Sequence, residues 1–281
     1  MRTTDRARRR RISRRVVRYA VLIVAAGVVL FPIYITVVDA LLSPQQITHR
    51  PPYLFPTSPH WGTFSLAFHE GDLGIYLRNS AIVTIAIVAF ELITSVLAAY
   101  AFVFLRFPGR KILFFVSIAT LMVPAEATII PNYQTIDKFG LLNTFPALIL
   151  PFIANGIGIF LFRQAFMSFP SEIRDASQLD GCGNLRFLLR IVVPINRPVI
   201  GAFGLFAFLT SWNQYLWPLV VTQTNSVRTV QIGLRQLSGL SFSQFDVLFA
   251  GTVLAAAPIA ILLVIFQRQL VAGLTAGAIK G

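Results

Sequence analysis

Three carboxylates interrupt long apolar stretches of this 281-residue chain. Asp39 lies near the end of the first stretch, Glu91 in the middle of the second and Glu126 in the third. An ionisable group in such a stretch is costly, so it usually lines a pathway or binds a neighbouring helix. Pro124 and Pro131 are expected to bend or break the helix around Glu126, and the freed carbonyl groups suit a cavity lining. For Glu91, a hydrogen bond between helices is an equally good explanation.

Amide and aromatic side chains are concentrated in another apolar stretch, within residues 212–217. An interfacial belt of aromatic residues accounts for Trp217 and partly for Tyr215. It accounts poorly for Asn213 and Gln214, whose amides suit hydroxyl groups or a partner helix. Aromatic faces beside amides are what a sugar or polyol needs. The residues predicted to line a solute pathway are Glu91, Glu126, Trp212, Asn213, Gln214 and Tyr215.

The composition indicates a membrane protein. Only 12% of the residues are charged and 56% are hydrophobic, whereas a soluble domain carries about 25% charged residues. The three histidines lie in one polar loop, and the sequence contains no His-Glu-x-x-His, Gly-x-Ser-x-Gly or Walker phosphate-binding motif. We therefore expect no enzyme activity, no metal site and no cofactor bound by this chain. ATP and Mg²⁺ are expected on a separate subunit.

Six stretches are long and apolar enough to cross the hydrocarbon core, which takes about 20 residues. The predicted helices are residues 19–42, 79–104, 112–131, 142–162, 199–221 and 247–266. With the N-terminus in the cytoplasm, 19 of the 24 Lys and Arg residues fall on the cytoplasmic side, which agrees with the positive-inside rule. The predicted fold is an all-α integral membrane protein with six transmembrane helices and both termini in the cytoplasm.

The net charge of +13 has the same explanation, because nine arginines lie in residues 1–18 and most other basic residues flank apolar runs. This pattern sets topology and attracts anionic lipid. We therefore expect the lipid bilayer, and no nucleic acid, as the partner of these charges. Residues 1–18 are predicted to be a basic cytoplasmic segment, and residues 19–281 the transmembrane domain.

The segment 163–198, between the fourth and fifth predicted spans, has the pattern of a short helix, a glycine turn and a second helix. Ser171 is predicted as an N-cap, and Glu172 and Asp175 follow in the first turns, where carboxylates suit the helix dipole. Gly181 is expected to end this helix in the left-handed conformation. A second helix over residues 184–192 is expected to run toward Pro194.

This segment resembles the signature loop of permease subunits in ABC importers, which reads Glu-Ala-Ala, three residues, Gly, nine residues, Ile, any residue, Leu, Pro. The matching positions are Asp175, Ala176, Ser177, Gly181, Ile191, Val193 and Pro194. The departures are Asp for Glu, Ser for the second Ala and Val for Leu. Asp180 also fits, because residues 179–181 resemble an Ile-Asp-Gly step common in the family. The resemblance implies that this loop, with Glu172 in its first helix, docks on a cytoplasmic ATPase and relays its motion to the spans.

Other stretches resemble the carbohydrate-uptake branch of these importers, the maltose and glycerol-3-phosphate type. They are residues 79–80, 98–111 and the tail 273–281, which reaches the ATPase interface in some relatives. The resemblance implies a location in the bacterial cytoplasmic membrane. It also implies a second homologous permease subunit, two ATPase subunits and an extracytoplasmic solute-binding protein as partners, with transport by alternating access.

The substrate is expected to be a small polar solute. Residues 212–219 and 124–126 resemble permeases for glycerol-3-phosphate or glycerophosphodiesters. No Lys or Arg lies clearly inside a predicted span, so a zwitterion such as glycerophosphocholine fits better than a bare phosphate, with an acid and an aromatic ring holding its trimethylammonium group. A sugar such as trehalose or maltose is the alternative. A proton-coupled secondary transporter, with Glu91 and Glu126 as proton sites, is a second alternative, although the sequence shows no clear inverted repeat.

Overall fold

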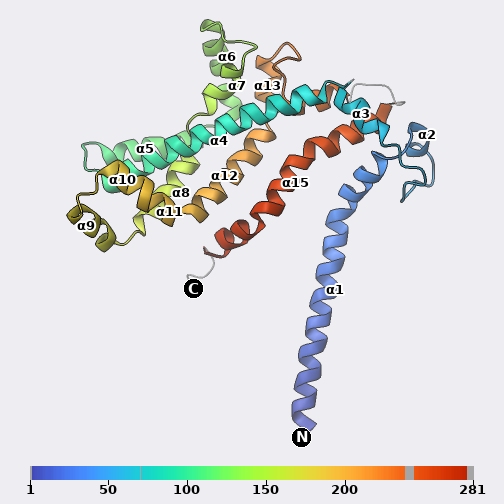
Figure 1. Cartoon of the computed structure of the whole chain (residues 1–281), viewed down its shortest axis with the longest axis horizontal. Coiled ribbons are helices and arrows are strands. Elements are labelled where there is room, and N and C mark those ends of the chain that lie inside the picture. Colours follow the sequence, from blue (N-terminus) through green and yellow to red (C-terminus); the bar gives the residue numbers. More distant parts are fainter. Residues whose placement is uncertain (1, 70, 238–243, 277–281) are drawn as a thin grey trace. The chain divides into compact units, whose positions relative to one another are not determined.

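The computed structural model describes residues 2–69, 71–237 and 244–276, and all the regular structure in these residues is helical (Figure 1). The chain divides into two compact units. The first comprises Met1–Gly71 with Gln236–Ala255, and the second comprises Asp72–Arg235 with Ala256–Gly281. Most of the predicted tail, residues 277–281, lies outside the described residues, and residues 273–276 end the last helix.

The first unit packs around small side chains. Its helices are α1 (Arg2–Asp39), α2 (Pro44–Ile47), α3 (Gly62–His69) and the first part of α15 (Phe245–Ala276). Ala40, Ala67 and Ala250 are fully buried against one another, and the lack of larger side chains lets α3, α15 and the end of α1 approach closely. Helix α1 runs without interruption from the basic segment into the first apolar stretch.

The second unit contains the remaining helices. They are α4 (Leu73–Phe104), α5 (Arg110–Ala119), α6 (Ile129–Lys138), α7 (Phe145–Ile149), α8 (Gly156–Met167), α9 (Ser171–Leu179), α10 (Asn184–Phe187), α11 (Val193–Ile195), α12 (Arg197–Trp212), α13 (Leu216–Val221), most of α14 (Val230–Leu237) and the end of α15. Short segments with other helical geometry join them: η1 (Thr120–Met122), η2 (Ala125–Thr128), η3 (Leu150–Phe152) and the π-helical η4 (Leu188–Val192).

Three helices are long and apolar enough to cross a membrane alone, namely Arg14–Asp39, Leu73–Phe104 and Phe245–Gln267. Three helix pairs pass the same test together, although each is bent. They are Arg110–Met122 with Ala125–Lys138 (97°), Phe145–Phe152 with Gly156–Met167 (44°), and Asn184–Ile195 with Arg197–Trp212 (81°). By length and composition the described residues therefore form three spans, or up to six if each bent pair is one span. The six-span count and the orientation of the termini stay predictions.

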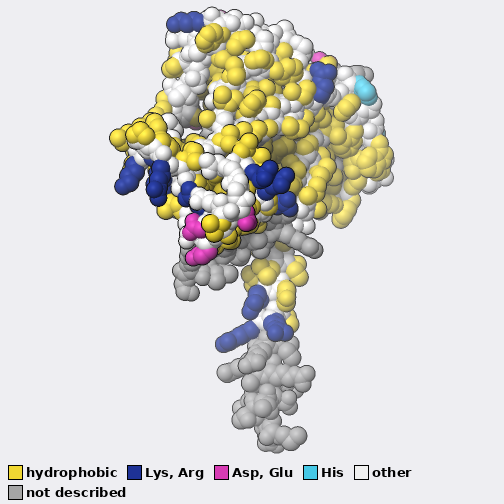
Figure 2. Space-filling view, turned by 60° about the vertical axis from the view of Figure 1, so that its left-hand side comes forward, with side chains coloured by type: hydrophobic (Ala, Val, Ile, Leu, Met, Phe, Trp, Pro, Cys, Tyr) yellow, Lys and Arg dark blue, Asp and Glu magenta, His cyan; other side chains and the backbone are white. Residues whose placement is uncertain are grey.

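The molecular surface agrees with a lipid environment. Hydrophobic side chains cover much of the face shown in Figure 2, and Lys and Arg side chains lie in a few separate groups. Large apolar side chains of α5 are more than half exposed, among them Ile112 and Phe115. Exposed apolar area on this scale is rare in soluble monomers and is normal where lipid forms the solvent.

Two predicted spans were expected to be continuous helices, and that expectation is wrong. The predicted helix 142–162 is interrupted between Phe152 and Gly156, where Asn155 caps α8 by accepting a hydrogen bond from the Ile157 amide (2.9 Å). The predicted helix 199–221 is interrupted between Trp212 and Leu216. Only the break in the third predicted span contains a proline inside the gap.

The break predicted near Pro124, in the third predicted span, is confirmed. Pro124 has φ −59° and ψ 135°, an extended conformation between η1 and η2. Its ring prevents a helical hydrogen bond from its own nitrogen and disfavours a helical residue before it. The chain therefore turns by 97° between the segments on either side.

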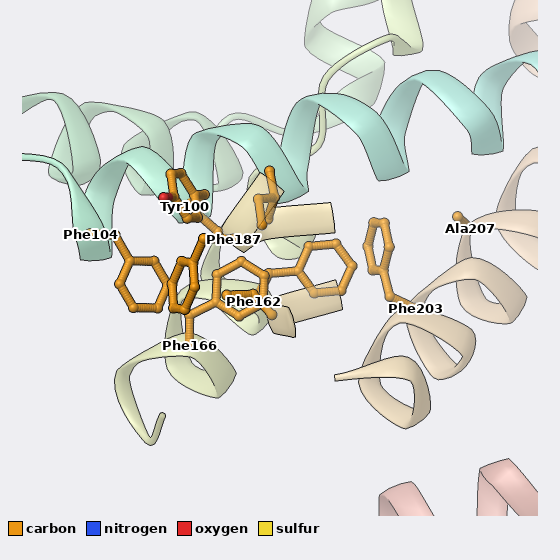
Figure 3. Close-up of a cluster of buried hydrophobic side chains, with 10 residues drawn as sticks. Tyr100, Phe104, Phe162, Phe166, Phe187, Phe203 and Ala207 are labelled. Atoms are coloured by element: carbon orange, nitrogen blue, oxygen red, sulfur yellow. The ribbon is translucent and has the colours of Figure 1, made fainter. Parts of the chain in front are cut away.

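Aromatic side chains form the core where α4, α8, α10 and α12 meet (Figure 3). The buried rings are Tyr100, Phe104, Phe162, Phe166, Phe187 and Phe203. The Phe104 and Phe187 rings lie 5.5 Å apart at 88°, and the Phe162 and Phe203 rings lie 5.3 Å apart at 75°. Edge-to-face pairs of this kind each contribute about 0.5–1.5 kcal/mol beyond the burial of their area. This aromatic core fixes α10, and hence the 163–198 loop, to the apolar helices.

Gly158 allows α8 to approach this core. A Cβ atom on Gly158 would lie 2.5 Å from the Ser95 hydroxyl oxygen of α4 and 2.6 Å from the Phe203 ring of α12. Both distances are shorter than side chains tolerate, so the backbone of α8 must lack a side chain here.

We predict that Gly158→Ala destabilises the protein by about 1–3 kcal/mol, the range for overpacking a filled core. The measurement is the thermal unfolding midpoint in mild detergent. Gly201→Ala is the matched control, because nothing lies within 4 Å of a Cβ there and alanine favours a helix. Equal unfolding midpoints for the two variants would contradict the close approach of α8.

Candidate solute pathway and coupling loop

Two of the helix breaks face one another across a cavity of about 360 Å³. One wall is η2 with the start of α6, and the other is the break between α12 and α13. Phe152, at the end of η3, completes the lining. The lining residues are Ala125, Glu126, Thr128, Ile129, Asn132, Phe152, Asn213, Gln214, Tyr215, Leu216 and Trp217. The structure therefore brings together Glu126, Asn213, Gln214 and Tyr215, four of the six residues predicted for the pathway.

Asn213 ends α12 and holds the second wall in place. Its side-chain amide donates to the Leu209 carbonyl (2.8 Å), and its side-chain oxygen accepts from the Gln231 amide (3.3 Å). Gln231 also donates to the Trp212 carbonyl (3.4 Å). The bond to the Trp212 carbonyl replaces one that a continuous helix would have supplied internally, and this break contains no proline.

The far end of α13 is tied to the turn before α7. Asn143 is in the left-handed conformation (φ 59°). Its side-chain oxygen accepts hydrogen bonds from the backbone amides of Gln223 (2.8 Å) and Thr224 (3.0 Å), and its backbone amide donates to the Val221 carbonyl (2.8 Å). Asparagine tolerates this conformation better than most residues do. These three hydrogen bonds of Asn143 fix the position of α13 and therefore of the cavity wall.

The cavity combines one carboxylate with several amides. Glu126 is exposed, and Asn132, Asn213 and Gln214 supply amide groups, while the residues that line the cavity include no Lys or Arg. Amides donate and accept hydrogen bonds, so they suit hydroxyl groups. This lining can therefore bind a neutral polar solute or a cationic group, and it offers no positive side chain to an anion.

Trp212 and Trp217 have different roles. The indole nitrogen of Trp217 donates to the Ala147 carbonyl (2.9 Å), and its ring meets Phe152 edge-on at 6.3 Å. Trp217 is largely buried but lines the cavity. Trp212 is also buried, stacks on Phe208 at 5.4 Å and is not among the lining residues.

Glu91 does not line this cavity. It is 5% exposed, and one carboxylate oxygen accepts a hydrogen bond from the side-chain amide of Asn155 (3.0 Å). Nearby on α4, Thr94 donates to the Ile153 carbonyl (2.8 Å) and Ser95 donates to the Asn155 carbonyl (3.3 Å). Three side chains of α4 thus bind the break before α8. This geometry fits the interhelical explanation that the sequence left open for Glu91.

Sequence reasoning missed three polar or aromatic lining positions, Thr128, Asn132 and Phe152, and attributed a fourth, Trp217, to an interfacial belt. Asn132 had a usable signal, because it directly follows Pro131 in the stretch already expected to bend. Phe152 had a similar signal, because it directly follows Pro151, but this stretch was predicted as one continuous helix.

The first helix of the 163–198 loop ends as predicted. Gly181 has φ +69°, and the Gly181 and Cys182 amides donate back to the carbonyls of Gln178 (3.0 Å) and Ser177 (2.9 Å). Asp180 is the C-cap of this helix. The predicted N-cap is wrong, since Ser171 is the first helical residue and Pro170 precedes it without a side-chain cap bond. Proline has a fixed φ that suits the start of a helix.

One face of α9 is anchored and the other is open. Arg174 donates to the Phe104 carbonyl (2.7 Å), and Ser177 is buried with its hydroxyl bonded to the Arg174 carbonyl. Other side chains of α9 are exposed: Glu172, Ile173, Asp175, Ala176 and Leu179. Leu179 is 89% exposed, so this face combines acidic side chains with an exposed apolar one.

The second helix of the loop begins at Asn184, as predicted, and extends beyond residue 192 to Ile195. Pro194 cannot donate a helical hydrogen bond, and the chain before it widens into the π-helical η4. Ile191 packs against the aromatic core, and the Tyr100 hydroxyl donates to the Asn184 side chain (3.2 Å). The loop is therefore attached to α4 from both of its helices.

Comparison with known proteins shows what kind of protein has this arrangement. Residues 91–275 match the family of binding-protein-dependent transport system inner membrane components. The chain belongs to this family. It is a permease of an ABC-type importer and lies in the inner membrane. The family match includes both the cavity and the 163–198 loop.

Relatives support this assignment over nearly the whole permease. The sn-glycerol-3-phosphate transport system permease protein UgpE of Yersinia pestis is 34% identical over 264 residues, which cover 91% of this chain and 94% of that protein. The arabinooligosaccharides transport system permease protein AraQ of Halalkalibacterium halodurans is 39% identical over 227 residues, which cover 80% and 81%. A bacterial ABC transporter involved in the import of the acidic polysaccharide alginate has the same fold, with a TM-score of 0.80, 23% identity, and 90% and 95% coverage.

We predict that Glu91 acts in this permease through its hydrogen bond and not through its charge. Glu91→Gln keeps an oxygen that accepts from Asn155, so the unfolding midpoint and transport should stay near wild type. Glu91→Ala leaves the Asn155 amide without its partner, which costs about 1–3 kcal/mol and should lower the midpoint. A stable Glu91→Gln complex that no longer transports would show that the charge itself is required.

Proposed function

We propose that this permease moves a small polar solute from an extracytoplasmic binding protein to the cytoplasm by alternating access. A second homologous permease completes the pathway, and two ATPase subunits supply the energy. The observation that carries the proposal is the cavity between the two helix breaks, where the side chains of Glu126, Asn213 and Gln214 converge. Broken helices at membrane depth occur where the backbone lines a cavity or lies buried in protein.

For the substrate, we propose a glycerophosphodiester such as glycerophosphocholine, or glycerol-3-phosphate. Relatives that cover nearly the whole chain are named for glycerol-3-phosphate transport. The amides fit the glycerol hydroxyl groups, and Glu126 beside Tyr215 and Trp217 fits a trimethylammonium group through charge and cation–π attraction. A sugar is the second candidate, because the AraQ relative is named for arabinooligosaccharides and the cavity lining carries no positive charge.

The experiment is uptake into proteoliposomes that contain the purified complex, with its binding protein outside and ATP inside. Glycerophosphocholine, glycerol-3-phosphate, maltose and trehalose are offered in turn at equal concentration. Uptake of a glycerophosphodiester or glycerol-3-phosphate supports the proposal, and uptake of sugars alone overturns the substrate assignment. Uptake that requires a proton gradient and continues without ATP would overturn the importer mechanism in favour of a secondary transporter.

We further propose that the exposed face of α9 docks on an ATPase subunit. Glu172, Asp175, Ala176, Ser177, Asp180 and Gly181 would form the docking helix and its turn, and Ile191 and Pro194 would attach the second helix to the core. Leu179 and Ile173 offer apolar contacts, and the acidic residues between them set the orientation of the partner.

Gly181→Asp should uncouple ATP hydrolysis from transport. A non-glycine residue at φ +69° is strained, so the end of α9 must rearrange and move the docking face. We expect an assembled complex whose transport falls by roughly tenfold or more, equivalent to about 1.4 kcal/mol of lost coupling, while its ATPase activity persists. Gly183→Ala is the control, because Gly183 has an ordinary φ of −68° and no atom near a Cβ. Normal coupling in Gly181→Asp would count against the docking assignment.

Glu126→Gln should discriminate between substrates. Loss of the carboxylate removes its attraction for a trimethylammonium group, so the KM for glycerophosphocholine should rise on the order of tenfold. Transport of an uncharged solute or of glycerol-3-phosphate should not weaken. Asp137→Asn, an exposed carboxylate on α6 outside the cavity, is the matched control. An equal loss for all substrates would mean that Glu126 supports the structure and does not select the solute.

A further inference from the structure

Four basic side chains gather where α4 ends and α5 begins. Arg106, Arg110 and Lys111 lie on or beside the connecting turn, and Arg163 reaches the same place from α8. They line two adjoining cavities of about 620 and 350 Å³, which share Arg110 and Lys111. Neither the proposed pathway nor the docking face of α9 uses any of these residues. We call these four residues the basic pocket.

The charges of the basic pocket are not neutralised within the described residues. No described carboxylate forms an ion pair with any of the four. Arg110 donates to the Leu105 carbonyl (3.0 Å), and the Arg163 guanidinium stacks over the Phe114 ring at 4.1 Å. Arg106 and Lys111 are exposed, and their head groups bind no other described side chain. Two cations are thus held in place, and two remain available to an anion.

The pocket lies at the edge of the apolar region. The long apolar helix α4 ends at Phe104, and the next apolar segment begins at Arg110. From the pocket, α5 presents Ile112, Phe115 and Val116 outward, with 68%, 69% and 56% of their surfaces exposed. Positive head groups therefore adjoin an open apolar helix face.

We propose that the basic pocket binds an anionic phospholipid. Arg106 and Lys111 bind the phosphate, Arg110 and Arg163 complete the positive field, and the acyl chains lie along Ile112, Phe115 and Val116 of α5. Arginine binds phosphate with two parallel hydrogen bonds, and basic pockets between membrane helices take lipid head groups. A soluble phosphate compound would find the same cations but no use for the apolar face, and this distinguishes the two sources of phosphate.

The test is native mass spectrometry of the intact transport complex in mild detergent, with phosphatidylglycerol or phosphatidylcholine added. The wild-type complex should retain phosphatidylglycerol in preference to phosphatidylcholine. The double variant Arg106→Gln/Lys111→Gln should lose this preference about 25-fold, since each cation near an anionic lipid surface adds roughly fivefold in affinity. Arg50→Gln/Lys138→Gln, which removes two exposed basic residues elsewhere, should behave as wild type.

Four results would overturn the proposal. The first is equal retention of the two lipids by wild type. The second is unchanged phosphatidylglycerol retention by Arg106→Gln/Lys111→Gln. The third is displacement of the lipid by millimolar glycerol phosphate, which lacks acyl chains and would identify a site for soluble phosphate. If the double variant loses the ATPase subunit while it keeps its lipid, the pocket is a protein interface and the proposal also fails. Arg106→Gln alone provides a milder variant if the double variant does not assemble.

Discussion

The fold depends on how the chain satisfies backbone groups where its apolar helices break. An unpaired amide or carbonyl in hydrocarbon costs several kcal/mol, so each break requires specific partners inside the protein. At the break before α8, Thr94 and Ser95 donate to the Ile153 and Asn155 carbonyls. At the break after α12, Gln231 donates to the Trp212 carbonyl. Polar residues in these apolar segments therefore stabilise the breaks, in addition to the role in solute binding that we propose for some of them.

This constraint explains why structural and pathway roles are hard to separate by residue type. Asn213 accepts a hydrogen bond from Gln231 and also lines the cavity, whereas Glu91 accepts one from Asn155 and does not line the cavity. Both are polar groups in an apolar stretch, and the sequence placed them in the same predicted pathway. The difference arises from tertiary geometry, because the face of α4 that carries Glu91 packs against residues 153–155, just before α8.

The sequence sufficed for features with a local chemical cause. Pro124 breaks its helix by its ring, Gly181 ends α9 by its left-handed backbone, and the loop spacing identified the family that residues 91–275 match. It failed where the cause is distant. The breaks at residues 153–155 and 213–215 lack proline, so hydropathy predicted continuous helices. Partners up to 64 residues away make the first of these breaks stable, and the local sequence does not identify those partners. The prediction of Ser171 as the N-cap failed for a different reason, because Pro170 fits the position before the helix equally well.

Helix α4 is the element that joins the parts of the second unit. Its start binds the segment before α14, through Asn79 to the Ser226 and Arg228 carbonyls and through Ser80 to the Val230 amide. Its middle binds the break before α8, and its end binds α9 and α10 through Phe104 and Tyr100. With 32 residues and no interruption, it is about 48 Å long. In the proposed mechanism, α4 therefore connects the 163–198 loop with the break before α8.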